Sequence, residues 1–195
     1  MYEAEVSEMS KFKKKVIWFF SIVMSTLLLS VQFSLPVFAI PSNYSIGVPI
    51  VTQSLSNWCW AACGASTVNY YGGSITQANY CYTTIGSYSN TVVPMSTMAG
   101  GLTSYGLNNH VVSGHLSYQG IQSESYTFHR PIVAGCVYYS GIGHIVLVQG
   151  YRTNSFGVDQ VICMDPAYNS YQYIDYSAFV SNLSYFWAES IDSIY

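Results

Sequence analysis

The segment from Ser56 to Gly73 places the strongest constraint on the fold. It contains tryptophan, tyrosine, alanine and small polar residues, with no charged side chain on any face of a helix. A helix that is apolar all round is normally buried in the middle of a domain. Ser56 or Asn57 can cap its start, and Gly72-Gly73 is a typical end signal. The sequence therefore predicts a central, buried helix running to about Tyr71.

The sequence pattern changes once along the rest of the chain. Residues 40–56 resemble an extended loop, and two further helices are predicted, one over 74–84 capped by Ser74 or Thr76 and one over 95–108. The second half is rich in β-branched and aromatic residues, which predicts strands at 130–139, 144–152, 160–166 and 171–176, a helical turn at 177–183 and a closing strand at 185–191. Helices followed by an antiparallel sheet indicate an α+β domain over residues 40–195.

The N-terminal 39 residues have the features of an export signal. Lys11, Lys13, Lys14 and Lys15 precede an apolar run over 16–39 that ends in Val37-Phe38-Ala39. This order is typical of a secretory signal peptide, although the apolar run is also long enough for an uncleaved membrane anchor. We therefore expect a secreted or extracytoplasmic protein of the cell envelope. It would contact a membrane only through this segment if the segment is not cleaved.

The charge of the remaining chain excludes one class of partner. Residues 40–195 contain two cations, Arg130 and Arg152, and six acidic residues, so their net charge is 2 − 6 = −4. A chain without a basic surface does not bind the phosphates of nucleic acids. No nucleic-acid partner is expected, and nothing in the sequence indicates an oligomeric state.

Five cysteines are present, an odd number for an exported protein. They do not have zinc-site spacing, and no metal or organic cofactor is expected. Cys63 is interpreted either as a small buried residue or as a disulfide partner, for instance of Cys81. Cys136 and Cys163 lie in apolar strand segments and are expected in the core; a disulfide between them requires neighbouring strands.

Four residues could together carry nucleophilic chemistry. Cys59 lies at the start of the buried helix, where free backbone N–H groups favour a thiolate. His144 begins an alternating strand and could be its base, and Asp165 follows an apolar strand and could orient that base. Gln53 could donate to an oxyanion. Taken singly, the last three could equally be a core or turn histidine, a turn-capping aspartate and a polar loop residue. The other histidines, at 110, 115 and 129, are expected on the surface.

Three segments of the chain resemble the papain-like cysteine peptidases. "QSLSNWCW" is similar to the active-site segment of that family, "GHIVLVQGY" to its histidine strand, and "MDP" stands where a third catalytic residue would follow. The similarity covers about 53–73, 130–151 and 160–180 and is greatest to compact bacterial members, which are related to bacteriocin-leader peptidases and to plant-pathogen effector peptidases. It implies a papain-like fold in which a helical part with the cysteine packs on a sheet with the histidine and aspartate.

The resemblance also implies the function and the role of each residue. Cys59 would be the nucleophile, His144 the general base and acid, Asp165 the orienting group and Gln53 the oxyanion donor, acting on a protein or peptide substrate. Two alternatives stay open. One is a cysteine-dependent amidase or acyl transferase acting on cell-wall or peptide substrates, and the other is a non-catalytic binding module on the same fold.

Overall fold

The computed structural model describes residues 9, 11–19 and 39–195. The chain divides into two units, residues 1–39 and residues 40–195, and residues 11–19 of the first are helical. The predicted signal peptide, and with it the choice between cleavage and anchoring, lies mostly outside the described residues. Within the described residues, no helix combines the length and apolar character needed to cross a membrane.

In the unit over 40–195, three helices precede most of the strands, as predicted, although one short strand comes before them. Its helices are α2 (Cys59–Tyr70), α3 (Gln77–Ile85), α4 (Met95–Ser104), α5 (Tyr118–Gln122), the π-helix η1 (Ser123–Thr127) and α6 (Tyr176–Val180). Its strands are β1 (Asn43–Ser45), β2 (His110–Ser113), β3 (Ile132–Tyr138), β4 (Gly143–Thr153), β5 (Asp159–Met164), β6 (Tyr171–Asp175) and β7 (Tyr185–Asp192). The helix predicted over 95–108 ends earlier, at Ser104. The α+β class is confirmed.

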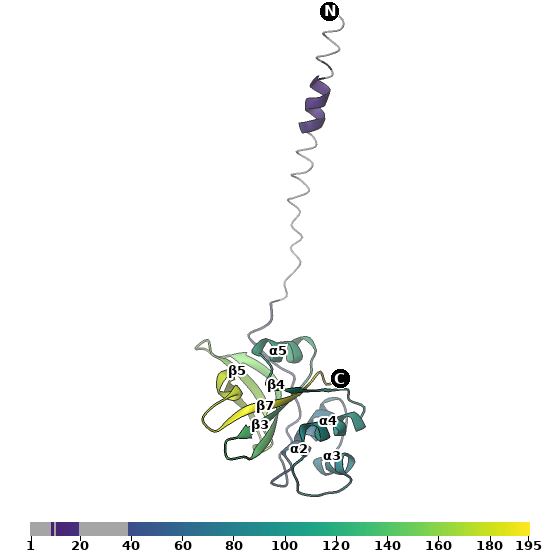
Figure 1. Ribbon diagram of the computed structural model, residues 1–195, viewed down its shortest axis with the longest axis vertical. Coiled ribbons are helices and arrows are strands. Elements are labelled where there is room, and N and C mark those ends of the chain that lie inside the picture. The colour runs from purple at the N-terminus through teal and green to yellow at the C-terminus, as the bar shows by residue number, and fades with distance from the viewer. Residues whose placement is uncertain (1–8, 10, 20–38) are drawn as a thin grey trace, which may run out of the picture. The chain divides into compact units, whose positions relative to one another are not determined.

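The strands form one antiparallel sheet in the order β2-β7-β3-β4-β5-β6, and β1 pairs with the C-terminal part of β4. Side chains alternate between its two faces. Ile145 and Leu147 pack with α2 and α4, whereas Val146 and Val148 pack with α5 and α6 on the other face. Figure 1 shows α2, α3 and α4 grouped beside the sheet, with α2 nearest to its strands. The sheet is thus covered on both faces.

Helix α2 is the buried helix that the sequence predicts. Every residue from Cys59 to Val68 is buried. The predicted capping residues are wrong, however: the N-cap is Trp58, and no side chain caps the helix. Helix α3 has the predicted cap, because Thr76 accepts a hydrogen bond from the Asn79 backbone N–H in a capping box.

All five cysteines are free thiols. Cys63 therefore occupies its position as a buried residue, and its thiol donates to the Ile145 carbonyl oxygen at 3.5 Å. The disulfide considered between Cys63 and Cys81 is absent. Cys136 on β3 and Cys163 on β5 are in the core, but β4 lies between those strands, so the condition for a disulfide between them is not met.

Gly64 sets the distance between α2 and α3. A Cβ atom there would lie 2.2 Å from the ring of Tyr80, which is fully buried and donates from its hydroxyl to the Met98 carbonyl. We expect Gly64→Ala to lower the free energy of unfolding by about 1–3 kcal/mol, because the helices must separate. Gly100→Ala is the matched control: no atom lies within 4 Å of its added Cβ, so alanine should stabilise α4 slightly. Denaturant unfolding of both variants measures this, and equal stabilities would contradict the prediction.

Candidate active site

Cys59 is the first residue of α2, and only 8% of it is exposed. Because no side chain caps this helix, its first backbone N–H groups have no side-chain acceptor at the N-cap. These groups and the helix dipole favour negative charge at this position. The missing cap therefore matters for the chemistry of the site, because the N–H groups at the start of α2 remain available to a thiolate or an oxyanion.

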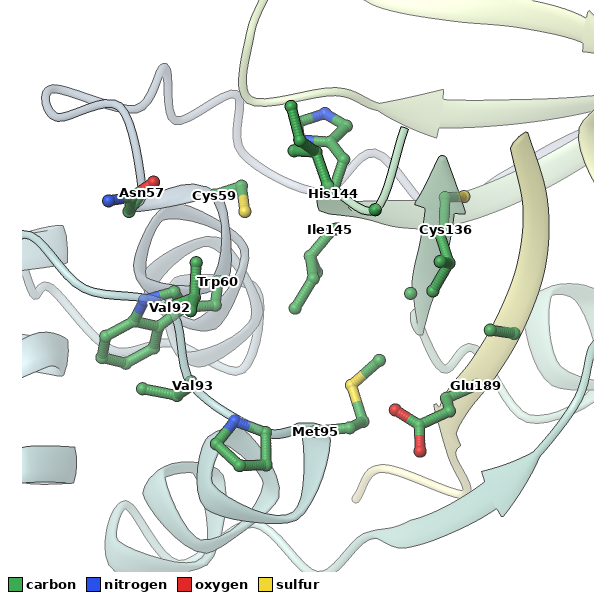
Figure 2. Close-up of a pocket in the computed structure, with 17 residues that line it drawn as sticks. Asn57, Cys59, Trp60, Val92, Val93, Met95, Cys136, His144, Ile145 and Glu189 are labelled. Carbon is green, nitrogen blue, oxygen red and sulfur yellow. The ribbon is translucent and has the colours of Figure 1, made fainter. Parts of the chain in front are cut away.

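His144 lies next to Cys59, at the start of β4 (Figure 2). The preceding hairpin turns at Gly141, whose φ of 86° suits glycine, and this turn places His144 at the mouth of the cleft. Its Nε2 is 2.7 Å from Oδ1 of Asp165, which follows β5. A carboxylate can only accept, so Nε2 carries the hydrogen and Nδ1 is the nitrogen left for the thiol.

Asp165 is itself held in place. Its Oδ1 also accepts from the Ala167 backbone N–H at 2.9 Å, and its carbonyl oxygen accepts from the Tyr168 N–H at 2.9 Å. Only 16% of the Asp165 side chain and 19% of the His144 side chain are exposed. The carboxylate therefore has one orientation, set by a turn, and this orientation fixes the imidazole ring.

The surroundings of His144 favour its charged form. Burial alone would lower the pKa of its imidazole, but the hydrogen bond to Asp165, a side-chain hydrogen bond with Cys59 and the charges of both groups raise that pKa to about 9. At neutral pH the ring is thus an imidazolium. An imidazolium beside a cysteine side chain is the arrangement that activates a cysteine nucleophile.

Gln53 lies in the same hollow as Cys59 and His144. Its Nε2 donates to the carbonyl oxygens of Leu55 and Ser56, both at 3.0 Å, so its two amide hydrogens are used within its own loop. Its Oε1 is buried without a partner among the described residues. The structure thus places Gln53 at the site, but with its donors directed to the loop in this state.

The loop before Cys59 is fastened by Asn90, which the sequence analysis did not identify. Its Oδ1 accepts from the Asn57 N–H at 3.0 Å, its carbonyl accepts from the Asn57 side chain at 3.1 Å, and its Nδ2 donates to the Ser56 hydroxyl at 3.0 Å. The indole N–H groups of Trp58 and Trp60 donate to the carbonyls of residues 89 and 91, both at 2.9 Å. These bonds hold Ser56 and Asn57 in the loop that precedes α2.

Two hollows meet at Cys59 and His144. One, of about 450 Å³, is walled by residues 92–95, 135–137, 141–145, 188 and 189, and Figure 2 shows it between α2, β3, β4 and β7. The other, of about 330 Å³, is lined by Gln53, Tyr138, Asp165 and Tyr168 among others. The thiol and the imidazole therefore stand at the centre of a cleft that continues on both sides, as an extended chain would require.

The other four thiols have surroundings that keep them protonated. Burial, followed by the charges of Cys59 and Asp165, raises the pKa of Cys63 well above its ordinary value. Burial and Asp165 raise the pKa of Cys136 to about 12. Burial is also the main cause of the raised pKa values of Cys81 and Cys163. Cys59 differs from them because it is the only thiol of the described structure that lines both hollows beside His144.

The remaining candidates for chemistry lie elsewhere. His110, His115 and His129 are exposed, as predicted, and His110 pairs with Asp192 at 3.3 Å rather than with the cleft. In the described part of the chain, no three histidine, cysteine or acidic residues are arranged to hold a metal ion.

Neither a family model nor a curated protein matches the sequence, whereas solved structures do match the fold. A double glycine motif protease from an AMS/PCAT transporter, solved in complex with the leader peptide, has a TM-score of 0.56 at 15% identity over 76% of this chain and 94% of that chain. The peptidase domain of Streptococcus ComA, a bi-functional ABC transporter involved in a quorum sensing pathway, has a TM-score of 0.58 at 14% identity, covering 75% and 98%.

A C39-like peptidase from Bacillus anthracis also matches, with a TM-score of 0.53 at 12% identity over 78% of this chain and 98% of that chain. These three proteins share the arrangement of helices and antiparallel sheet described above. The fold of residues 40–195 is therefore that of the compact, papain-like C39 peptidase domains.

Proposed function

We propose that the protein is an exported cysteine peptidase that hydrolyses peptide bonds with Cys59, His144 and Asp165. The observation that carries the proposal is a thiol at the start of a buried, uncapped helix, beside an imidazole whose Nε2 is held by a carboxylate at 2.7 Å (Figure 2). The cleft on both sides of this pair supports a substrate longer than one residue. The fold shared with C39 peptidase domains agrees with this reaction.

The reaction has two halves. The Cys59 thiolate attacks the carbonyl carbon of the scissile bond, and the resulting tetrahedral intermediate expels the amine, which takes the proton of the His144 imidazolium. A thioester between Cys59 and the acyl part of the substrate remains. Neutral His144 then removes a proton from water, the hydroxide attacks the thioester, and the carboxylic acid leaves as the thiolate and imidazolium are restored.

The oxyanion that forms in each half needs donors fixed in advance. The backbone N–H of Cys59 belongs to the uncapped first turn of α2 and supplies one. Gln53 supplies the second once one of its amide hydrogens leaves the Leu55 or Ser56 carbonyl. Asp165 keeps its charge next to the imidazolium and does not take its proton.

The proposed substrate is a protein or peptide outside the cytoplasm. A peptide substrate is supported by the double glycine motif protease, which has this fold and was solved with a leader peptide in place. Export is supported by the four lysines that precede the apolar segment over 16–39.

Labelling of the thiols tests the proposal. The protein without residues 1–39, treated with an epoxide or iodoacetamide probe near neutral pH, should be modified at Cys59 much faster than at the four protonated thiols. His144→Ala should slow labelling of Cys59 by about tenfold or more, and a library of peptides should be cleaved by the parent protein. Peptide mapping by mass spectrometry identifies the labelled residue.

Other results would point elsewhere. Equal, slow labelling of several cysteines would reject the activated pair and favour a binding module on this fold. Rapid labelling of Cys59 without hydrolysis of any peptide, but with transfer of an acyl group to an added amine, would favour the acyl transferase alternative.

A further inference from the structure

Glu189 is the carboxylate that lines the larger hollow of the cleft at its far end from Cys59. It lies on β7, and the other residues around this hollow are mostly apolar, among them Val92, Pro94 and Met95. Figure 2 shows the Glu189 side chain directed toward Met95 and the inside of the hollow. The proposed peptidase reaction does not use this residue.

The register of the sheet sets the distance between Glu189 and the reacting groups. Glu189 pairs with Gly135 on β3, and Gly135 pairs with Ile145 on β4, the residue after His144. Because neighbouring strands are about 4.8 Å apart, Glu189 lies about 10 Å across the sheet from the histidine strand. An extended peptide advances about 3.3 Å per residue, so this distance corresponds to about three residues.

Gly135 keeps the floor of the hollow open along this path. A Cβ atom at this position would lie 2.5 Å from the Met95 methyl group and 3.8 Å from the Glu189 Cβ. The backbone of Gly135 is extended, so glycine is needed here for space rather than for a special dihedral angle. Any larger side chain would fill the route between the Cys59–His144 pair and Glu189.

The charge of Glu189 is not balanced by the domain. Within the described residues, no hydrogen bond or ion pair reaches its carboxylate, whereas the Trp187 indole donates to its backbone carbonyl at 2.8 Å. The two arginines of residues 40–195 are used elsewhere: Arg130 lies over the rings of Phe128 and Tyr195, and Arg152 over Tyr173. Glu189 is exposed, so water solvates its carboxylate in the free protein, and a cationic substrate can supply the counter-ion that the domain does not.

We propose that Glu189 is a specificity-determining residue that selects substrates with a lysine or arginine within about three residues of the scissile bond. The inference rests on the proposed peptidase function. The cation would cross the apolar hollow with its aliphatic stem against Met95 and place its charged end on the carboxylate. The net charge of −4 on residues 40–195 attracts such substrates before they bind.

Peptides that differ only in Lys, Gln or Glu, scanned over three residues on each side of the cleaved bond, test this. At one position the parent protein should prefer Lys over Gln by about fivefold in kcat/KM, as expected for a partly exposed ion pair, and the ratio should fall at high salt. Glu189→Gln should reduce the ratio to about one, and Glu189→Lys should reverse it in favour of Glu. Asp159→Asn, which removes an exposed acid outside the cleft, should leave the ratio unchanged.

The preference for the Lys peptide over the Gln peptide can also be measured as binding affinity, in a variant that cannot react. Calorimetry with Cys59→Ala should show about fivefold tighter binding of the Lys peptide than of the Gln peptide, and with Cys59→Ala/Glu189→Gln no difference. Equal ratios in the parent and in Glu189→Gln would overturn the role of Glu189 while leaving the peptidase proposal intact. Absence of cleavage together with retained, Glu189-dependent binding would overturn the peptidase proposal alone.

Discussion

Replacing Cys59 with alanine is expected to lower kcat/KM for peptide hydrolysis by about 10⁴-fold or more. The variant lacks the atom that forms the thioester, and removal of a catalytic nucleophile typically costs 10⁴- to 10⁶-fold. The fold should be retained, because alanine suits the start of a helix whose next residues are all buried. Steady-state kinetics with a peptide that the parent protein cleaves measures the loss, and circular dichroism checks the fold.

Cys63→Ala is the matched control for this experiment. It removes a thiol one turn further along the same helix, which donates to the Ile145 carbonyl and does not line the cleft. We expect its kcat/KM to stay within a few-fold of the parent value. If Cys63→Ala abolished hydrolysis and Cys59→Ala did not, the assignment of the nucleophile would be reversed.

Asp165→Asn is expected to lower kcat/KM at neutral pH by about 10²-fold and to move the alkaline limb of the pH profile toward neutrality. Asparagine can still accept the Nε2 hydrogen bond, but it lacks the negative charge that helps to raise the pKa of His144 to about 9. In the parent protein the imidazolium is therefore lost only near pH 9, and activity should fall there. Kinetics from about pH 5 to 10 and NMR titration of the imidazole both measure the shift.

The same shift predicts how stability depends on pH. Because the pKa of His144 in the folded protein is above its ordinary value of 6.5, protonation favours the folded state. This contribution is complete below about pH 6.5 and is lost as the pH rises through about 9. Asp165→Asn should flatten this part of the stability curve. Asp192→Asn is the control, because it removes an acid that pairs with His110 and not with His144. It should leave unchanged the parts of the activity profile and of the stability curve that depend on His144. An identical effect of the two variants would contradict this prediction.

The main elements of the fold could be predicted because their patterns are strong and local. Burial on every face explains why α2 has no charge, and the antiparallel strands β3, β4 and β5 carry continuous apolar segments because both faces of the sheet are covered. Strand β2 was missed, since it is a short edge strand with largely exposed side chains. The helices α5 and η1 were missed as well; both are short and partly exposed.

The features that the sequence did not predict, the helix cap and the pairing of the cysteines, depend on contacts between distant parts of the chain. Ser56 and Asn57 are good capping residues, but both are held in the preceding loop by Asn90, more than thirty positions away. The pairing of cysteines depended on strand order, which places β4 between Cys136 and Cys163. Cys59, His144, Asp165 and Gln53 were predicted as a group from their positions at element ends, and the structure brings them to one cleft; their roles remain predictions.

Glu189 and Gly135 were not found in the sequence for a similar reason. Each lies within a strand. In a strand sequence, an acidic residue normally indicates a solvent-facing position, and a glycine normally indicates a position that weakens the strand. The roles proposed for Glu189 and Gly135 follow from the register between β3 and β7 and from the position of Met95, at the start of α4, next to them. A glycine next to apolar residues in a strand was the one available signal, since it indicates a close approach by another part of the chain.

The separation of the reacting groups along the chain has a consequence for synthesis. Cys59 precedes His144 by 144 − 59 = 85 residues, and α2, α3 and α4 are complete before β3, β4 and β5 have been made. During translation the thiol thus exists for a time without its imidazole. Contacts of this sequence separation form late in folding. The nascent chain would consequently acquire its nucleophile only in the last steps of folding, when the sheet has docked on α2.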